Sequence, residues 1–281
     1  MRSDDSFEAM SSAVSAGSPV DGVIVVDKPP GVTSHDVVAA TRRRVGRGVK
    51  VGHAGTLDPF ATGVLLLLVG RATRAQRFLM ALPKRYETIV RIGWTSTTGD
   101  RDGEISPGRT PVEPLALPTG LVRQRPHAYS AVKVAGRRAY DLARRGEAVE
   151  LDEREVQVSR FSLEWRDGDR AGMVIECSTG TYVRSLIADL GDAYCLELRR
   201  TRIGDFDVAD ADPDRVIPLD DALGFLPDVR LSADDARRAG HGQAVSGRAE
   251  GPVRLRDEAG LIAVAEPRAD GLLKPVVGFR G

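Results

Sequence analysis

The chain has 281 residues, of which 42% are hydrophobic, and its 40 acidic and 40 basic residues give a formal net charge of zero. This length suits one large and one small domain, or two domains of medium size. The longest apolar run, residues 64–69, is too short to span a bilayer. The two cysteines, Cys177 and Cys195, lack the spacing and histidine partners of a zinc site or a disulfide scaffold, which indicates a reducing cytoplasm.

The N-terminal part begins with a polar segment and continues with a strand and a helix. Residues 1–20 are rich in Ser, Ala and Gly and lack the features of a signal peptide, so we expect a disordered tail. The fold begins near Asp21. Residues 23–26 predict a buried strand, which three residues stop: Pro29, Pro30 and Gly31. The segment TSHDVVAATRRRVG then predicts a helix, with Thr33 or Ser34 as its cap.

Strands and helices alternate irregularly through the middle of the chain. GVLLLLVG predicts a buried strand, and ATRAQRFLMALP predicts a helix with one apolar face: Ala75, Phe78, Leu79 and Leu82. RYETIVRIGW and GMVIECS alternate as strands do, and GTYVRSLIADLG begins a helix after a turn. The stretch 106–120, rich in Pro and Gly, predicts a loop. The irregular spacing of the strands argues against a doubly wound sheet.

The C-terminal stretch differs in style from the rest. From about residue 228 to residue 281, short apolar and polar runs alternate and are broken by Gly, Pro and Asp. This pattern is typical of a small unit made only of strands. The sequence therefore predicts an α+β catalytic body with a small β-barrel-like appendage.

The charges are unevenly distributed along the chain. From Arg123 to Arg145 there are seven basic residues and one acid, whereas residues 205–235 hold ten aspartates against two arginines. Two more basic clusters occur: Arg42, Arg43, Arg44, Arg47 and Lys50, and Arg199, Arg200 and Arg202. A neutral total can thus conceal a basic face suited to nucleic acid and a separate acidic face. The alternative is that these arginines lie on solvated helix surface.

Asp58 lies between small residues and a proline in the stretch VGHAGTLDPFATGVLLLLVG, and two compatible interpretations apply to it. Aspartate followed by proline often begins a helix, which makes Asp58 a candidate N-cap. It is also a candidate nucleophile, because the proline holds its backbone extended and three nearby glycines let a ligand approach: Gly52, Gly55 and Gly63. Free backbone N–H groups nearby are expected to keep this carboxylate ionised.

Other catalytic motifs do not occur in the sequence. The glycines around residue 50 fit neither a P-loop nor a dinucleotide-binding fingerprint, and there is no G-x-S-x-G elbow. The four histidines have no regular spacing, so we expect no metal site: His35, His53, His127 and His241. Taken alone, His53 is typical of a structural polar residue.

Six motifs occur in a characteristic order and at suitable distances: KPPGVTSHDVV, GHAGTLDPFATGVL, KRYETIVRIG, AYSAVKVAGRRAYDLAR, CSTGTYVRSLIADLG and LRRT. With these motifs the chain resembles the TruB family of tRNA pseudouridine synthases, which modify uridine 55 in the T arm. The resemblance covers residues 21–207, and the tail resembles the PUA-like domain of that family. A single GHAGTLDP would only be suggestive, whereas six ordered motifs are highly specific.

The resemblance implies an α+β fold, with a pseudouridine synthase mixed-sheet catalytic domain over residues 21–226 and a PUA-like RNA-binding domain over residues 227–281. An insertion at about residues 124–154 would grip the T stem-loop of the tRNA. The resemblance also implies a cytoplasmic monomer that needs no protein partner, membrane or cofactor. No cofactor is needed because the isomerisation involves no redox change.

The resemblance assigns the chemistry to four residues. Asp58 matches the catalytic aspartate, the nucleophile that attacks uridine at C6 of the base or at C1′ of the sugar. Arg184 matches the arginine that pairs with this carboxylate and keeps it ionised. Tyr86 matches the tyrosine that stacks on the target base, and Tyr182 matches a second pocket tyrosine. Tyr182 and Arg184 would point apart on a regular helix, so we expect both in the turn at its start.

Four further matches concern the shape of the pocket. Leu198 matches an apolar pocket wall, a role that overlaps with that of an ordinary core leucine. His53 matches the histidine that fills the space left by the flipped nucleotide, where its ring could stack on RNA bases. Lys28 and Pro29 match the Lys-Pro pair of the family, which we interpret as support for the pocket.

The sequence departs from the family pattern in two places. His127 stands at the second of two prolines ahead of YSA, and the segment before LRRT lacks a Gly-Ala-His, which bears on the placement of Leu198. Two other functions stay open. One is an RNA-binding or RNA-folding protein for which isomerisation is incidental, and the other is a guide-RNA-directed subunit that needs protein partners. Activity of the purified chain on a bare transcript would distinguish them.

Overall fold

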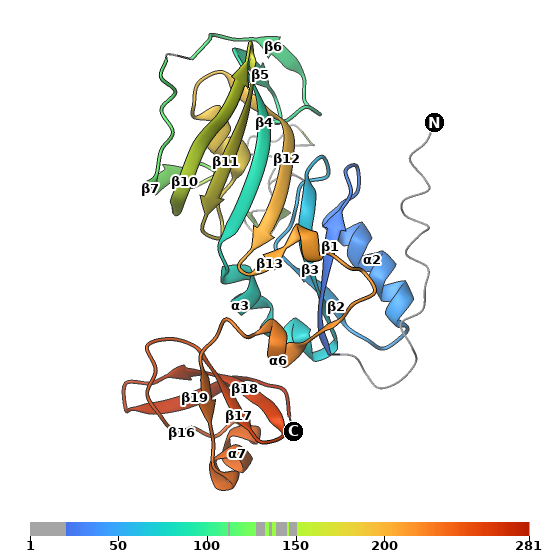
Figure 1. Ribbon diagram of the computed structural model, residues 1–281, viewed down its shortest axis with the longest axis vertical. Coiled ribbons are helices and arrows are strands. Elements are labelled where there is room, and N and C mark those ends of the chain that lie inside the picture. The colour runs from blue at the N-terminus through green and yellow to red at the C-terminus, as the bar shows by residue number, and fades with distance from the viewer. Residues whose placement is uncertain are drawn as a thin grey trace.

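The computed structural model describes residues 21–111, 113–127 and 151–280, together with residue 145 and the backbone of residues 133–134 and 137–138. Figure 1 shows an elongated molecule with a large sheet at the top and a small sheet at the bottom, near the C-terminus. The predicted tail and most of the predicted insertion lie outside the described residues. The α+β class is confirmed, since both sheets are mixed and the helices are few and short.

The large sheet contains ten strands within the described part of the chain, and eight of them follow the order β14-β1-β3-β12-β4-β11-β10-β7. Strands β3 and β12 run parallel, and the other neighbours in this order are antiparallel. The strands are β1 (Gly22–Lys28), β2 (Val51–Ala54), β3 (Thr62–Val69), β4 (Lys84–Ile92), β7 (Gly120–Gln124), β10 (Arg154–Asp167), β11 (Arg170–Cys177), β12 (Ala193–Ile203), β13 (Phe206–Asp207) and β14 (Ile217–Pro218).

Strand β3 is an almost continuous apolar run because both of its faces are covered. Leu65 and Leu67 belong to a hydrophobic cluster with residues of helix α2 (Ser34–Val45). Leu66 and Leu68 belong to a second cluster, which includes Phe78 of helix α3 (Gln76–Ala81). Burial on two faces explains why the predicted strand shows no polar alternation.

Helix α2 begins where the sequence predicted, and the structure selects Thr33 over Ser34 as its cap. The Thr33 hydroxyl accepts a hydrogen bond from the Asp36 backbone N–H, and the Asp36 carboxylate accepts one from the Thr33 backbone in return. Ser34 is buried, and its hydroxyl accepts from Leu57 N at 2.9 Å. Ser34 therefore ties the start of α2 to the loop that carries Asp58.

Two predicted helices differ in extent from the structure. The segment ATRAQRFLMALP forms a 3₁₀ turn, η1 (Gly70–Ala75), followed by the short helix α3, instead of one helix. The Thr73 hydroxyl donates to Gly70 O at 2.8 Å within this turn, a local bond that competes with regular helix geometry. Helix α5 (Val183–Ala188) is shorter than the predicted segment, because its chain turns off at Gly191, which has a φ of 117°.

The remaining elements of the large part are short. They comprise η2 (Val208–Asp210), helix α6 (Leu219–Ala222) and two small hairpins, β5 (Trp94–Ser96) with β6 (Ile105–Pro107) and β8 (Lys133–Val134) with β9 (Arg137–Arg138). Helix α5 packs its Leu186 and Ile187 into the main core cluster, between β4, β10, β11 and β12. This packing fixes the start of α5 beside the sheet, where the site described below lies.

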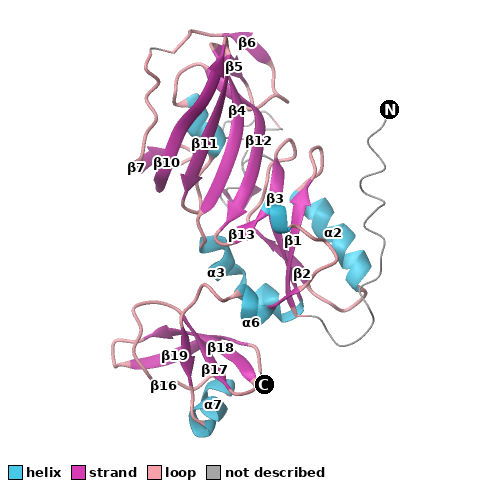
Figure 2. Cartoon of the chain, viewed as in Figure 1, coloured by secondary structure: helices cyan, strands magenta, loops and turns pink. Residues whose placement is uncertain are grey.

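The C-terminal part is a five-stranded sheet, in agreement with the predicted small β domain, and it also contains one helix that the sequence did not predict. Its strands follow the order β15 (Asp228–Arg230), β17 (Val253–Asp257), β18 (Gly260–Pro267), β19 (Leu272–Gly278) and β16 (Val245–Ser246). Figure 2 shows helix α7 (Ala233–Gly240) below this sheet. Ser232 caps α7, which is hard to detect from sequence because only Ala239 of the helix is buried.

The small sheet is attached to the large part by apolar and ionic contacts. Val264 and Phe279 belong to the same hydrophobic cluster as Leu223, which follows α6. The carboxylate of Asp220 in α6 pairs with Arg254 and Arg256 of β17, at 3.2 and 2.7 Å. The two parts are therefore held in a defined relative position.

Candidate active site

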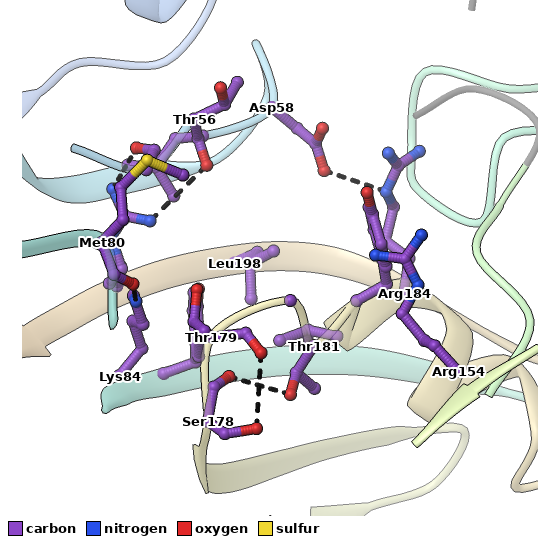
Figure 3. Close-up of a pocket in the computed structure, with 17 residues that line it drawn as sticks. Thr56, Asp58, Met80, Lys84, Arg154, Ser178, Thr179, Thr181, Arg184 and Leu198 are labelled. Carbon is purple, nitrogen blue, oxygen red and sulfur yellow. Dashed lines mark hydrogen bonds and ion pairs between the residues drawn. The ribbon is translucent and has the colours of Figure 1, made fainter. Parts of the chain in front are cut away.

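A pocket of about 490 Å³ lies beside the parallel pair β3 and β12. Its walls come from the loop 55–58, the strands β4 and β12, and the turn that leads into α5. Five of the eight residues that the sequence predicted for the site line this pocket: Asp58, Tyr86, Tyr182, Arg184 and Leu198. Figure 3 shows Asp58 and Arg184 meeting at one side, with Met80 and Lys84 at the other.

Asp58 lies in the loop between β2 and β3, and no helix begins there, so the N-cap interpretation is wrong. The chain instead makes a tight turn, in which Ala61 N donates to Asp58 O at 3.1 Å, and β3 begins at Thr62. Because a strand follows, no helix N-terminus provides free N–H groups to the carboxylate. The expectation that backbone N–H groups keep it ionised is therefore wrong, whereas Arg184, the arginine that the resemblance paired with it, does contact the carboxylate.

Arg184 bridges two carboxylates with different nitrogen atoms. Its Nε lies 3.0 Å from Oδ2 of Asp58, and its Nη1 lies 3.0 Å from Oδ2 of Asp100. Nη1 also donates to Thr98 O at 2.7 Å. The side chains of Arg184 and Asp100 are 5% and 7% exposed, whereas that of Asp58 is 35% exposed. Asp100 and the Thr98 carbonyl thus hold the guanidinium through its Nη1, and the partly exposed Asp58 carboxylate lines the pocket.

Burial raises the pKa of Asp58, and the Arg184 guanidinium opposes this rise. The nearby carboxylate of Asp100 adds to it. Asp58 therefore ionises at a higher pH than a solvated aspartate and depends on Arg184 for its charge. A partly desolvated carboxylate oriented by a guanidinium is suited to nucleophilic attack.

Tyr86 and Leu198 come from the neighbouring strands β4 and β12, and both side chains are buried at the pocket. Burial raises the pKa of Tyr86, and the guanidinium of Arg200 opposes the rise. The phenol therefore stays protonated at neutral pH. An aromatic ring next to an aliphatic side chain provides an apolar surface of the kind that a planar base contacts.

Tyr182 directly precedes α5 and Arg184 is its second residue, so both lie at the beginning of the helix. The backbone N–H of Tyr182 donates to Oε1 of Gln124 at 2.7 Å. The guanidinium carbon of Arg154 lies 5.4 Å from the centre of the Tyr182 ring. Tyr182 is therefore positioned by strands β7 and β10 as well as by its own helix.

Lys28 and Pro29 lie outside the pocket lining, next to the loop that carries Asp58. The Lys28 side chain is fully buried, and its Nζ donates to the carbonyls of Pro29, Val32 and Pro59 at 2.8, 2.9 and 3.2 Å. Burial lowers the pKa of Lys28 to about 8. Because Pro59 follows Asp58 directly, Lys28 holds the backbone next to the candidate nucleophile.

His53 also lies outside the pocket lining. It belongs to β2, and its ring contacts the His35 ring edge-on, with 5.6 Å between the ring centres. Its backbone carbonyl accepts from Gln76 at 2.7 Å. The residue that departs from the family pattern, His127, lies against Gly99 near Arg184, and burial lowers its pKa.

Three residues that line or support this pocket were not predicted as parts of the site: Asp100, Lys84 and Arg200. Arg200 is 1% exposed, and it donates to Val64 O at 2.8 Å and to Gly55 O at 3.0 Å. Arg200 belongs to the motif LRRT, which assigned it no role, and to a basic cluster, which suggests the opposite environment. Asp100 carried no signal, because its partner Arg184 is 84 residues away.

The basic clusters contribute less to the surface than their charge suggested. Arg44 pairs with Asp214 at 2.9 Å, and Arg199 pairs with Asp27 at 2.6 Å. With Arg200 buried, the arginines of two clusters serve partly to join distant strands and loops. The predicted cluster from Arg123 to Arg145 lies mostly outside the described residues.

Within the described residues, no group of His, Cys, Asp and Glu could hold a metal ion. In the same part of the chain, no helix is long and apolar enough to cross a membrane. Neither finding bears on which reaction the pocket performs.

Two parts of the sequence match descriptions of one family. Residues 42–183 match the N-terminal domain of TruB family pseudouridylate synthases, and residues 227–279 match the C-terminal domain of pseudouridine synthase II TruB. The chain belongs to the TruB family. The resemblance inferred from the six motifs is thus confirmed, and so is the prediction of an enzyme that forms pseudouridine.

Relatives of this TruB protein match it over most of its length. The tRNA pseudouridine synthase B of Thermobifida fusca (strain YX) is 44% identical over an alignment of 294 residues, which covers 93% of this chain and 99% of the relative. The tRNA pseudouridine synthase B of Corynebacterium aurimucosum is 44% identical over an alignment of 232 residues, which covers 76% of each chain.

A solved structure of an H/ACA RNP bound to a substrate RNA containing 2′-deoxyuridine superposes with a TM-score of 0.66 at 22% identity, over 92% of this chain and 85% of that chain. A Cbf5-Nop10-Gar1 complex gives a TM-score of 0.63 at 24% identity, with 88% and 78% of the chains covered. At such identity the similarity concerns the fold, and the expected mixed-sheet fold of a pseudouridine synthase is confirmed.

Proposed function

We propose that this TruB-family enzyme converts uridine 55 in the T arm of tRNA to pseudouridine, without a cofactor. The observation that carries the proposal is the ion pair of Asp58 with Arg184 in a pocket of a size suited to one nucleoside. The names of the relatives support tRNA as the substrate. The six ordered motifs support the choice of uridine and the assignment of the site.

The reaction moves one bond from nitrogen to carbon. The N1–C1′ bond of uridine breaks, the uracil turns, and a C5–C1′ bond forms. C5 releases its proton and N1 gains one, so that atoms and electrons balance without an oxidant or a reductant. The carboxylate of Asp58 supplies the nucleophile, attacking either C6 of the base or C1′ of the sugar, and is regenerated when the product forms.

The other pocket residues support this step in different ways. Arg184 orients the carboxylate and keeps it ionised in a partly desolvated site. Tyr86 stacks on the uracil, and its protonated phenol is available for proton transfer. Leu198 forms an apolar wall, and Tyr182 closes the pocket beside Arg184.

The uridine reaches Asp58 only after it has left the folded T loop. Extruding a base costs a few kcal/mol, which stacking and phosphate contacts offset. We assign His53 to the space left by the extruded nucleotide, because it lies on β2 just ahead of the Asp58 loop. Lys28 and Pro29 support the pocket through the carbonyl bonds of the Lys28 Nζ.

The roles of the two domains are those of the family. Residues 21–226 form the catalytic domain, with an insertion at residues 124–154 that grips the T stem-loop. Residues 227–281 form a PUA-like RNA-binding domain, which the family match from residue 227 and the start of β15 at Asp228 support. The enzyme acts as a cytoplasmic monomer without an obligatory protein partner.

Tritium release tests this function directly. A tRNA transcript labelled with tritium at C5 of its uridines loses label only where a carbon–carbon bond to C5 forms. We expect the purified wild-type protein to release about one equivalent per tRNA, and Asp58→Ala and Asp58→Asn to release none. A transcript with cytidine at position 55 should release none with any of the proteins.

The outcomes separate the competing functions. No release by the wild type would favour a guided subunit or an RNA-folding protein over a stand-alone enzyme. Release by Asp58→Asn at the wild-type rate would remove Asp58 as the nucleophile. Release from the transcript with cytidine 55 would contradict the position of the target uridine while leaving the reaction intact.

A further inference from the structure

Four cationic side chains line the pocket: Lys84, Arg154, Arg184 and Arg200. Three of them already have polar partners. Arg184 contacts two carboxylates, and Arg200 and Lys84 donate to backbone carbonyls, which for Lys84 are those of Met80 and Leu82. These contacts satisfy most of their hydrogen-bonding capacity before any substrate enters.

Arg154, the first residue of β10, is different. Its Nε is shielded from solvent and has no hydrogen-bond partner, and among the described residues its guanidinium forms no ion pair. Its guanidinium carbon lies over the face of the Tyr182 ring, 5.4 Å from the ring centre. In Figure 3 its side chain extends into the pocket from the side on which Arg184 lies. A half-buried guanidinium with a shielded, unsatisfied Nε favours pairing with an anion that enters the pocket.

The position of Arg154 in the sheet explains why it points to the pocket. Side chains alternate between the two faces of β10, and Val156 and Val158 fill the core from the same face as Arg154. The buried face of β10 thus changes from valine to arginine at the point where the core borders the pocket. Gln124 lies directly opposite Arg154 on β7 and is 2% exposed.

Gln124 also has a hydrogen-bond donor without a partner among the described residues. Its Oε1 accepts from Tyr182 N, while its buried Nε2 has no partner. Arg154 and Gln124 therefore place two unsatisfied donors on neighbouring strands next to Tyr182, which contacts both side chains. The turn that continues this wall, Thr179 and Gly180, is exposed to solvent, as the outer part of a binding site would be.

We propose that Arg154, supported by Gln124 and the Tyr182 ring, forms an anion-binding subsite for a phosphodiester of the RNA backbone next to the extruded uridine. The proposal rests on the function proposed above. Within a uridine nucleotide the phosphate carries the negative charge, whereas the uracil carbonyls are neutral. A guanidinium binds a phosphate oxygen pair through parallel, charge-assisted hydrogen bonds, which fixes both the position and the orientation of the nucleotide.

A binding cycle with neutral linkages tests this subsite. The RNA is a synthetic T-arm stem-loop with one methylphosphonate on either the 5′ or the 3′ side of the target uridine. The matched RNA carries the same sugars with an ordinary phosphodiester. Affinities are measured by fluorescence anisotropy in an Asp58→Asn background, so that the RNA is not converted during the titration. Tritium release by the active protein reports separately on the proposed function.

We expect Arg154→Ala to weaken binding of the ordinary stem-loop roughly ten- to hundred-fold. One of the two methylphosphonates should weaken RNA binding by a similar factor when Arg154 is present. The same methylphosphonate should weaken binding to Arg154→Ala by less than about two-fold. Arg154→Lys should restore part of the affinity, since it keeps the charge and loses the planar fork. Circular dichroism and urea unfolding establish that the variants are folded.

Arg125 provides the matched control, because it directly follows Gln124, the β7 partner of Arg154, and has a 66% exposed side chain paired to Glu153. Arg125→Ala can change the affinity for the ordinary RNA, but the methylphosphonate should weaken its binding as much as it weakens binding to the protein with Arg125. Equal methylphosphonate penalties with and without Arg154, at both positions, would overturn the proposal. A loss of catalysis in Arg154→Ala without any such coupling would also overturn it, because Arg154 would then act on the base or on the fold.

Discussion

Arg184 and Asp100 form a buried ion pair, with 3.0 Å between Nη1 and Oδ2. The Nε of the same guanidinium contacts Asp58. Asp100 therefore acts on the candidate nucleophile through Arg184, without itself lining the pocket. This makes Asp100 a positioning residue whose removal should affect the reaction more than the binding of RNA.

We predict that Asp100→Asn lowers kcat by up to about a hundred-fold and leaves KM within about three-fold, because Arg184 loses the contact that fixes its orientation. Single-turnover pseudouridine formation measures this effect. Asp102→Asn is the control, since Asp102 lies in the same turn with a 61% exposed side chain. Equal effects of the two substitutions would show that the Arg184–Asp100 pair does not matter for catalysis.

The pH dependence of kcat should report on Asp58. Burial raises the pKa of this carboxyl, and the protonated form is not a nucleophile, so kcat should fall with decreasing pH at values above the range of a solvated aspartate. The Asp100 carboxylate adds to the rise. In Asp100→Asn the acidic limb should therefore move to lower pH. A shift to higher pH would contradict this electrostatic account.

Gly63 is needed where β3 meets β12. A Cβ at this position would lie 2.1 Å from the Arg200 carbonyl oxygen, and the residue has a φ of +105°. Gly63→Ala should therefore lower the free energy of unfolding by about 3 kcal/mol or more. Gly31→Ala is the matched control, because Gly31 has a φ of +83° with no atom within 4 Å, and should cost only about 1–2 kcal/mol. Urea denaturation measures both. Equal costs would exclude the steric contact as the cause.

Lys28→Met should lower the free energy of unfolding by about 1–3 kcal/mol near neutral pH, because three carbonyls lose their common donor. Burial lowers the pKa of Lys28 to about 8, so between about pH 8 and pH 10 the unfolded chain binds more protons than the folded protein. The stability of the wild type relative to Lys28→Met should accordingly increase with pH in this window. Urea midpoints at about pH 7 and pH 9.5 measure it, and a difference that shrinks with pH would contradict the prediction.

Much of the fold and of the candidate site could be predicted from local patterns. The continuous apolar run of β3, the alternation of β4 and the Thr33 cap of α2 each follow from a few consecutive residues. Predictions from local patterns were wrong where tertiary contacts determine the conformation. Asp58 followed by Pro59 has the sequence of a helix start. The segment is nevertheless a loop, because a strand and not a helix follows it.

The sequence by itself determined the family, the main strands and the five predicted residues that meet in the pocket, because ordered motifs and short-range periodicity are properties of neighbouring residues. Only the tertiary structure decided the partner of each charge. Arg199 reaches an aspartate 172 positions away, Arg200 is buried against the Asp58 loop, and Arg154 has no anionic partner among the residues that the structure describes. Electrostatic roles depend on distance in space and on exclusion of water, and neither is encoded in the spacing of charges along the chain.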